Sequence, residues 1–135
     1  MDDQGTVVGI EHISELYKKG VENISKSHKK LIDEGKIILK EGDGRKGVEE
    51  FSPYNCIHVG AASEKVPKAL VDQLKPGGRM MIPIGTYYQF IYLINKDEQG
   101  KITKEPVLTV RYVPLTDKEM QLAKAETNIY GFNDL

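Results

Sequence analysis

The sequence predicts an α/β domain built on a mainly parallel sheet. A strand, a helix, a turn and a second strand follow one another between Pro53 and Gly85, which is the order of a parallel βαβ unit. Another strand, helix and strand precede it, between Thr6 and Leu39. Two more strands joined by a short turn follow it, and they predict an antiparallel hairpin at the end of the sheet.

Composition agrees with a single soluble domain. The chain has 135 residues, of which 39% are hydrophobic and 29% charged, and its formal net charge is −1. A charge so close to zero gives no electrostatic reason to expect nucleic acid or a membrane surface as a partner. The N-terminal stretch MDDQGTVVGI lacks the regions of a signal peptide, and no apolar run approaches the ~20 residues that span a bilayer. The expected compartment is the cytoplasm, and the protein is expected to be a monomer if it is intact.

The first strand is predicted at Thr6–Ile10, and the helix after it begins near Ile13. Apolar residues recur there at helical spacing, at Ile13, Leu16, Tyr17, Gly20, Val21 and Ile24. The polar stretch Ser27–Lys36 predicts a loop with one helical turn, and Ile37–Leu39 is the next strand.

Glu11 and His12 lie at the carboxyl end of the first predicted strand. Nucleotide-binding α/β folds place a carboxylate at this position, where it accepts hydrogen bonds from both hydroxyls of a ribose. A glutamate that is merely solvated is the alternative interpretation.

The segment Gly42–Gly47 matches the pattern G-x-G-x-x-G, which raises a nucleotide-binding oxidoreductase as an alternative. In that fingerprint the third glycine packs against a helix that holds pyrophosphate and crosses back over the sheet. Only Val48–Phe51 stands before Ser52 and Pro53, whereas a crossover takes about 10–12 residues. We therefore interpret the segment as a glycine-rich turn with Asp43 at its tip, where turn chemistry alone would also explain an aspartate.

The central unit consists of a strand at Cys56–Val59, a helix, a tight turn at Lys75–Gly78 and a buried strand at Met80–Ile84. The helix is predicted from one apolar stripe, at Val66, Ala69, Leu70 and Leu74. Cys56 and His58 stand in an apolar strand, so we expect core residues rather than a nucleophile and a base. The three histidines and the one cysteine fit no metal-ligand spacing, which predicts no metal.

At the C-terminal end, strands are predicted at Gln89–Asn95 and Val107–Val113, with Pro114 ending the second. Thr116–Glu119 matches a capping box, with Thr116 as the N-cap of a short helix. The expected domain covers residues 1–122, and residues 123–135 are expected to form a mobile tail.

Three segments are specific in combination: YNCIHVGAA, VPKALVDQLKPGGRMMIPIG and YVPLTDKE. Together they resemble protein-L-isoaspartate (D-aspartate) O-methyltransferase of the eukaryotic type, and the resemblance runs from about Val7 to Gln121. It implies a Rossmann-like class I methyltransferase sheet with a C-terminal antiparallel hairpin. It also implies transfer of a methyl group from S-adenosylmethionine to the α-carboxylate of isoaspartyl residues in damaged proteins or peptides, which is a repair reaction.

The resemblance also assigns site residues. It implies that Glu11 and His12 contact the cofactor ribose and that Asp43 and Gly44 bind the adenine. Positions closing over the cofactor match Thr116 and Gln121, and a position contacting the substrate peptide matches Val113. No catalytic acid or base is assigned, because the ionised substrate carboxylate is itself the nucleophile.

The chain departs from the family pattern near its start. The resemblance implies an earlier strand with an acidic glycine-rich loop for the cofactor, and an upstream segment for the substrate carboxylate; neither is found before Gly5. That strand would lie between Val7–Ile10 and Cys56–Val59, so both edges should lack a partner. We expect a truncated form, first strand missing, of doubtful activity alone. A non-catalytic remnant that binds a partner through these edges is the alternative. Asn55 stands where the family has Asp.

Overall fold

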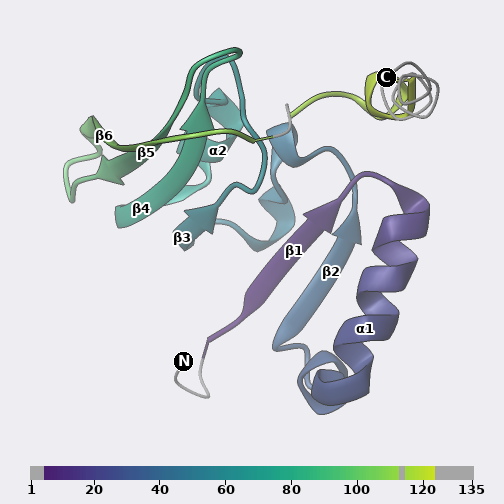
Figure 1. Ribbon diagram of the computed structural model, residues 1–135. Helices are drawn as coiled ribbons and strands as arrows, with labels where there is room; N and C mark the ends of the chain where they lie inside the picture. The colour runs from purple at the N-terminus through teal and green to yellow at the C-terminus, as the bar shows by residue number, and fades with distance from the viewer. Residues whose placement is uncertain (1–4, 113–114, 124–135) are drawn as a thin grey trace, which may run out of the picture.

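The computed structural model describes residues 5–112 and 115–123. Its strands fall into two sheets, one of two strands and one of four (Figure 1). The elements are, in chain order, β1 (Val7–Glu11), α1 (Ser14–Asp33), β2 (Ile37–Glu41), η1 (Gly44–Lys46), η2 (Glu49–Phe51), β3 (Tyr54–His58), α2 (Lys68–Asp72), β4 (Leu74–Ile84), β5 (Gln89–Lys96) and β6 (Ile102–Val110).

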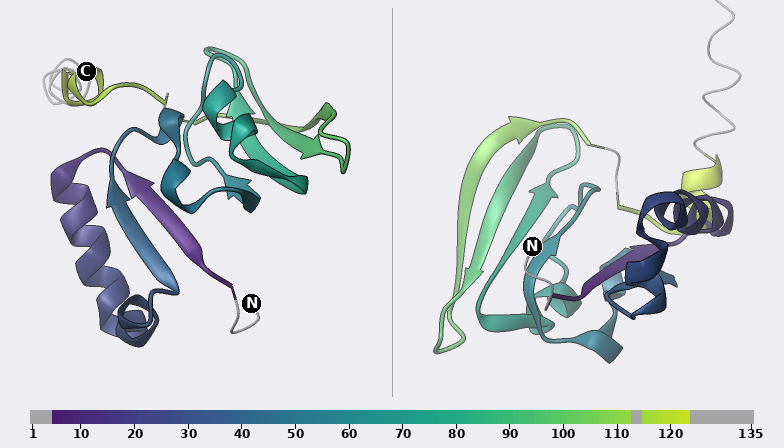
Figure 2. Two further views of the ribbon diagram at one scale, coloured as in Figure 1. Left: turned by 180° about the vertical axis from the view of Figure 1, so that it is seen from behind. Right: turned by 90° about the horizontal axis from the view of Figure 1, so that it is seen from below.

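The pairing of the strands confirms the predicted α/β class. β1 is parallel to β2, and β3 is parallel to β4, which confirms the βαβ unit. β5 and β6 then extend this sheet as antiparallel strands, in the order β3-β4-β5-β6, which confirms the predicted C-terminal hairpin. Figure 2 shows the larger sheet lying beside the smaller sheet and its helix α1.

β1 and β3 each have one strand partner among the described residues, since β1 pairs with β2 and β3 with β4. The two strands point the same way across the space between the sheets (Figure 1). In the described part of the chain, the opposite edges of the two strands, at Val7–Ile10 and Cys56–Val59, pair with no other strand.

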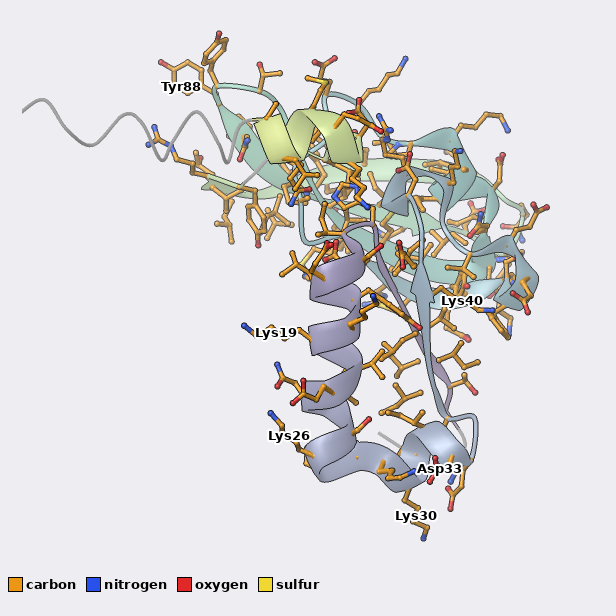
Figure 3. The ribbon with its side chains drawn as sticks, turned by 90° about the vertical axis from the view of Figure 1, so that its right-hand side faces the viewer. Lys19, Lys26, Lys30, Asp33, Lys40 and Tyr88 are labelled. Carbon is orange, nitrogen blue, oxygen red and sulfur yellow. The ribbon has the colours of Figure 1, made fainter. Side chains whose placement is uncertain are left out.

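Helix α1 is longer than predicted, because the expected loop at Ser27–Lys36 is helical as far as Asp33. His28 departs from helical geometry, with φ −129° and ψ 22°, and kinks the helix. Beyond the kink, Lys29 pairs with Asp33 at 2.9 Å, one helical turn away, and such i,i+4 pairs support a helix without apolar periodicity. Lys19, Lys26 and Lys30 point away from the body of the protein (Figure 3).

Helix α2 is shorter than predicted, because Leu74 already belongs to β4. The predicted tight turn at Lys75–Gly78 is a bulge inside this strand. Tyr54 pairs with Leu74, but Cys56, two residues later, pairs with Arg79, five residues later. Gly77 has a positive φ of 77°, a conformation that costs glycine nothing. The predicted turn between helix and strand is therefore wrong, because these residues form a bulge within β4, which already begins at Leu74.

The hydrophobic core lies between α2 and the larger sheet. Leu70, Leu74, Met80, Ile82 and Ile94 are each at most 4% exposed. Each such side chain contributes about 1.5–3 kcal/mol when it leaves water. Pairing Met80 with Ile94 and Ile82 with Tyr92 places these residues on one face of the sheet. The core thus fixes β4 and its partner β3, and β3 forms one wall of the functional site.

The return strand of the hairpin begins earlier than predicted, at Ile102 rather than Val107, and ends at Val110. Asp97 explains the early start, because its side chain accepts hydrogen bonds from the N–H groups of Gln99 and Lys101 at 3.0 and 2.8 Å. The turn is thereby closed at Lys101, and pairing resumes at once. Among the described residues no helix has the length and apolar character needed to cross a membrane.

Candidate functional site

A cavity of about 490 Å³ lies between β1 and β3. Residues that follow the carboxyl ends of both strands line it, His12 after β1 and Val59–Ala61 after β3, as in other open α/β sheets. Five predicted cofactor contacts from three separate segments line this cavity: Glu11, His12, Gly44, Thr116 and Gln121. The fold therefore brings together residues up to 110 positions apart in the sequence.

Glu11 is held in place by the start of α1. Its Oε1 accepts a hydrogen bond from the Ile13 N–H at 2.9 Å, and Ile13 is buried, at 5% exposure. The carboxylate is itself half-buried at the end of β1. A carboxylate so oriented can accept hydrogen bonds from neighbouring hydroxyl groups in the cavity.

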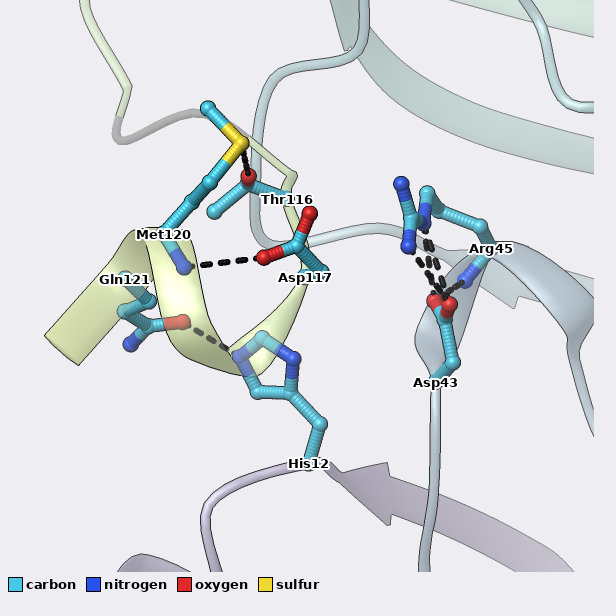
Figure 4. Close-up of polar contacts among 7 residues, drawn as sticks. All are labelled: His12, Asp43, Arg45, Thr116, Asp117, Met120 and Gln121. Carbon is cyan, nitrogen blue, oxygen red and sulfur yellow. Dashed lines mark hydrogen bonds and ion pairs between the residues drawn. The ribbon is translucent and has the colours of Figure 1, made fainter. Parts of the chain in front are cut away.

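His12 connects β1 to the C-terminal segment, because its Nε2 is hydrogen-bonded to Oε1 of Gln121 (Figure 4). The chain reaches this place through Leu115, whose N–H donates to the Ala62 carbonyl at 2.5 Å. Residues 118–123 are helical. The first turn of that helix therefore covers one end of the cavity.

The cap of this helix differs from the prediction. Asp117, not Thr116, accepts the hydrogen bond from the Met120 N–H, at 2.8 Å, and the helix begins at Lys118. The Thr116 hydroxyl instead donates to the Met120 sulfur at 3.5 Å (Figure 4). The prediction of Thr116 as the N-cap is therefore wrong. Asp117 is an equally good capping residue, and it lies three residues before Met120, whose N–H it accepts.

Asp43 does not line the cavity, although its neighbour Gly44 does. The Asp43 carboxylate accepts from the Arg45 N–H at 2.9 Å and forms an ion pair with the Arg45 guanidinium at 2.7 Å (Figure 4). The hydrogen bond from Arg45 lowers the pKa of Asp43 and outweighs partial burial, which acts in the opposite direction. Asp43 thus stays ionised and shapes the turn at the cavity rim.

The glycine segment is held from behind by Gln73, a buried residue that also lines the cavity. Gln73 Oε1 accepts from the Val48 N–H at 3.0 Å, and Gln73 Nε2 donates to the Lys46 carbonyl at 2.8 Å. Gly47 has φ 65°, and a methyl group there would lie 2.2 Å from Gln73 Oε1. Gln73 was missed from the sequence. The sequence feature that could have revealed it is a polar residue on the apolar stripe of the predicted helix, three residues after Leu70 and seven after Val66.

The dinucleotide fingerprint is absent from the fold of this segment. After Gly47 the chain forms the short 3-10 helix η2 (Glu49–Phe51) and then enters β3. The third glycine packs against the Gln73 side chain instead of a crossover helix. The interpretation as a glycine-rich turn is confirmed, and the oxidoreductase alternative loses the motif on which it depended.

Cys56 and His58 were predicted as core residues, and this is wrong, because both are exposed. Both line the cavity. The reason is the position of β3 at the edge of its sheet, where no strand of the described residues covers it on the side of the cavity. Within residues 5–112 and 115–123, no group of three or more His, Cys, Asp or Glu side chains could hold a metal ion.

Two predicted residues lie outside the described part of the chain. They are Val113, the predicted substrate contact, and Pro114, the predicted end of the last strand. Of the expected tail, Ala123 is helical, and residues 124–135 are not described.

Comparison with known proteins gives one consistent family. Residues 1–120 match the family model described as Protein-L-isoaspartate(D-aspartate) O-methyltransferase (PCMT). The chain is 51% identical over 120 residues to Protein-L-isoaspartate O-methyltransferase 2 of Arabidopsis thaliana, covering 88% of this chain and 39% of that protein. It is 52% identical over 119 residues to Protein-L-isoaspartate O-methyltransferase of Caenorhabditis elegans, covering 87% and 52%.

A solved structure agrees with these sequences. The crystal structure of a protein-L-isoaspartate O-methyltransferase from Plasmodium falciparum, in complex with S-adenosyl-L-homocysteine, superposes with a TM-score of 0.75 at 29% identity, covering 84% of this chain and 53% of that one. The chain thus spans 39% of the A. thaliana protein and about half of the C. elegans protein. A family model that matches residues 1–120 nonetheless covers nearly all of it. The chain belongs to the protein-L-isoaspartate (D-aspartate) O-methyltransferase family.

Proposed function

We propose that this chain forms the adenosine-binding part of an S-adenosylmethionine-dependent protein-L-isoaspartate O-methyltransferase. The observation that carries the proposal is the convergence of Glu11, His12, Gly44, Thr116 and Gln121 on one cavity. The same family includes a structure in complex with S-adenosyl-L-homocysteine, the product form of that cofactor. The whole protein would methylate the α-carboxylate of isoaspartyl residues and so act in protein repair.

The residues at the cavity fit an adenosine group. The Glu11 carboxylate, fixed by the Ile13 N–H, would accept hydrogen bonds from the two ribose hydroxyls, with His12 beside it. A methyl group added at Gly44 would lie 3.8 Å from Leu115 Cδ1 and 3.9 Å from Ile10 Cγ2. The cavity is therefore apolar beside Gly44, as a flat adenine ring requires, and Asp43 would hold the turn that contacts the ring edge.

The C-terminal segment would close the site. The His12–Gln121 hydrogen bond and the Leu115–Ala62 hydrogen bond anchor it over the cavity. Thr116 and Gln121 would then exclude water from the cofactor, and Val113 would contact the substrate peptide.

The proposed chemistry asks for alignment rather than for a strong base. When bound, S-adenosylmethionine supplies an electrophilic methyl group, and the substrate carboxylate is already ionised at neutral pH. The protein's contribution is to hold the two reactants in line and to exclude water. The methyl ester would then cyclise spontaneously to a succinimide, whose hydrolysis partly restores aspartate. The proposed reaction therefore asks for no acid–base pair among the residues that line the cavity.

The test is calorimetric titration of the chain with S-adenosylhomocysteine, adenosine and NAD. We expect the first two to bind and NAD not to compete. Glu11→Gln should weaken adenosine binding by about 1.5–3 kcal/mol, because a charged acceptor is lost. Glu15→Gln, on the exposed side of α1, is the matched control and should bind as the wild type does. Equal affinity of the wild type and Glu11→Gln would reject the ribose role.

Methyl transfer is measured separately, with labelled cofactor, an isoaspartyl peptide and the matching aspartyl peptide. Transfer specific to the isoaspartyl peptide supports the proposed substrate. Transfer to both peptides alike contradicts it.

A further inference from the structure

Asp43 and Gly44 form the only aspartate–glycine pair in the chain, and no asparagine is followed by glycine. The backbone nitrogen of the residue after an aspartate can attack the aspartate side chain, because the product is a five-membered ring. A glycine in that position has no side chain to hinder the approach. The sequence therefore marks Asp43 as the aspartate of this chain that is most open to spontaneous rearrangement.

The rearrangement has two steps. The Gly44 nitrogen forms a bond to Cγ of Asp43, and the amide proton and the carboxyl OH leave together as water, which gives a succinimide. Water then adds to either carbonyl of the ring. Opening at Cγ restores aspartate, whereas opening at the main-chain carbonyl leaves Gly44 attached through Cγ and the α-carboxylate of residue 43 free. The second product is an isoaspartyl linkage.

The backbone of the folded turn opposes the first step. Asp43 has φ −79° and ψ 113°, and this ψ directs the Gly44 nitrogen away from Cβ of Asp43, whereas the ring requires both on one side of the Cα–C bond. Rotation about ψ would also displace the Asp43 carbonyl, which accepts a hydrogen bond from the Lys46 N–H at 3.0 Å. The reacting atoms are thus held out of a near-attack geometry.

Arg45 holds the carboxylate, which is the other reactant. Its N–H and its Nε donate to Oδ1 of Asp43 at 2.9 and 3.0 Å, and its Nη2 donates to Oδ2 at 2.7 Å (Figure 4). Charge-assisted pairing of this kind fixes the orientation of a carboxylate. The side-chain hydrogen bond from Arg45 also lowers the pKa of Asp43. A smaller fraction of the carboxyl group is then protonated, and only the protonated form loses water readily.

The other charges near this pair act in the same direction. Lys46, in the same turn, attracts the Asp43 carboxylate through its charge, more weakly than Arg45 does. Asp117 faces the Arg45 guanidinium from the C-terminal segment (Figure 4). The hydrogen bond to Asp43, together with the weaker charge effect of Asp117, raises the pKa of Arg45, so Arg45 stays a cation.

We propose that Asp43–Gly44 is the site at which this chain converts spontaneously to an isoaspartyl linkage, and that Arg45 is the positioning residue that keeps this conversion slow in the folded protein. The Asp43 side chain is 23% exposed, so water reaches it for the second step.

The conversion has a consequence for the cavity. An isoaspartyl linkage lengthens the main chain by a methylene group and removes the carbonyl that Lys46 binds. Gly44, which lines the cavity, must then move. A resulting loss of cofactor affinity rests on the proposed function, whereas the conversion itself rests only on the chemistry of Asp43 and its turn.

The experiment compares the folded 135-residue chain with a synthetic peptide of residues 37–50, which has the same sequence around Asp43 without the folded turn. Both are incubated at neutral and at mildly acidic pH. Isoaspartate at residue 43 is quantified by mass spectrometry after digestion with an endoproteinase that cleaves before aspartate and not before isoaspartate. The folded chain should convert at least about tenfold more slowly than the peptide, because its reacting atoms are misplaced.

Three variants of the folded chain test Arg45. Arg45→Met should convert about tenfold faster than the wild type, because hydrogen bonds to a charged group are lost. Arg45→Lys keeps the charge without the two-pronged geometry and should fall between them. Lys46→Met is the matched control, since it removes a charge from the same turn and keeps the Arg45 hydrogen bonds to Asp43. It should convert nearly as slowly as the wild type.

Two further readouts separate this role from general support of the turn. In the free peptide, Arg45→Met should change the rate little, because the pairing depends on the fold. In the folded wild type, the conversion should accelerate at a lower pH than in the peptide, since the Asp43 pKa is lowered, and Arg45→Met should move this profile toward that of the peptide. Thermal unfolding of each variant identifies an incubation temperature at which all of them are folded.

Three results would overturn the proposal. The first is that the folded wild type converts as fast as the peptide. The second is that folded Arg45→Met converts no faster than Lys46→Met. The third is that isoaspartate accumulates in Arg45→Met at another aspartate before it does so at residue 43.

Titration with S-adenosylhomocysteine keeps this inference distinct from the proposed function. Converted Arg45→Met, separated from the unconverted form by chromatography, should bind this ligand more weakly than the unconverted form does. A chain that converts at Asp43 as expected but binds the ligand in neither form would reject the proposed function and support this inference.

Discussion

The side chain of Gln73 holds the backbone of Val48 at the rear of the cavity. Gln73 Oε1 accepts from the Val48 N–H at 3.0 Å, although 25 residues separate them in the sequence. Its Nε2 donates to Lys46, two residues earlier in the same turn. One buried amide thereby replaces the crossover helix that a dinucleotide fingerprint would use.

Gln73→Leu should lower the free energy of unfolding by about 1–3 kcal/mol, because it removes the side-chain partner of the Val48 N–H and of the Lys46 carbonyl. Gln73→Glu keeps an acceptor for the Val48 N–H but at neutral pH buries a carboxylate that faces the Lys46 carbonyl, so we expect a loss at least as large as that of the Leu variant. Urea denaturation measures both. Gln99→Leu, at an exposed position of the β5–β6 turn, is the control. A Leu variant as stable as the control would contradict this role.

Gly47 and Gly44 should respond differently to alanine. Gly47 has φ 65°, and an added methyl group would lie 2.2 Å from Gln73 Oε1. We expect Gly47→Ala to cost at least about 1–2 kcal/mol from the backbone conformation alone. Gly44 has ordinary space for a methyl group, with its nearest neighbour at 3.8 Å.

Gly44→Ala should therefore leave the thermal midpoint nearly unchanged and, under the proposed function, reduce affinity for S-adenosylhomocysteine. Differential scanning calorimetry with and without this ligand separates the two effects. The expectation is wrong if Gly44→Ala unfolds as easily as Gly47→Ala.

Asp117→Ala should destabilise the helix over residues 118–123 by about 1 kcal/mol, because it removes the cap of the Met120 N–H. Thr116→Ala should leave that helix intact, since the Thr116 hydroxyl contacts only the Met120 sulfur among the polar contacts of this turn. Amide exchange of Glu119 and Met120 reports the local stability. Faster exchange in the Thr116 variant than in the Asp117 variant would restore threonine as the cap.

Acid should remove the contribution of the Asp43–Arg45 pair. The hydrogen bond from Arg45 lowers the pKa of the Asp43 carboxyl below its ordinary value of 3.8. The stabilisation is therefore fully present at pH values above 3.8, and it is lost as the pH falls through the lowered pKa of the folded protein. The two side chains are 23% and 41% exposed, which limits the contribution to about 1 kcal/mol.

The stability difference between the wild type and Asp43→Asn should therefore shrink as the pH falls from about 7 to about 2. Urea denaturation across this range measures it. A difference that stays constant down to the lowest pH would show that the carboxylate charge contributes nothing.

The sequence by itself determined the order of the strands and the residues at their carboxyl ends. Short apolar runs located β1, β2 and β3 to within one or two residues, because such runs bounded by polar or glycine residues are typical of strands. The position of Glu11 follows directly, since it comes immediately after an apolar run. The length of Val48–Phe51 was enough to exclude a crossover helix.

Only the tertiary structure decided which polar groups meet. Asp117 rather than Thr116 is the cap because two neighbouring residues were both competent, and the backbone geometry selected one. The exposure of Cys56 and His58 depends on a strand edge that faces the cavity, which their own apolar surroundings in the sequence do not reveal. Gln73 looks like an interruption of an apolar stripe until the fold brings Val48 within hydrogen-bond distance. These outcomes depend on contacts between distant segments, and local propensity carries no information about them.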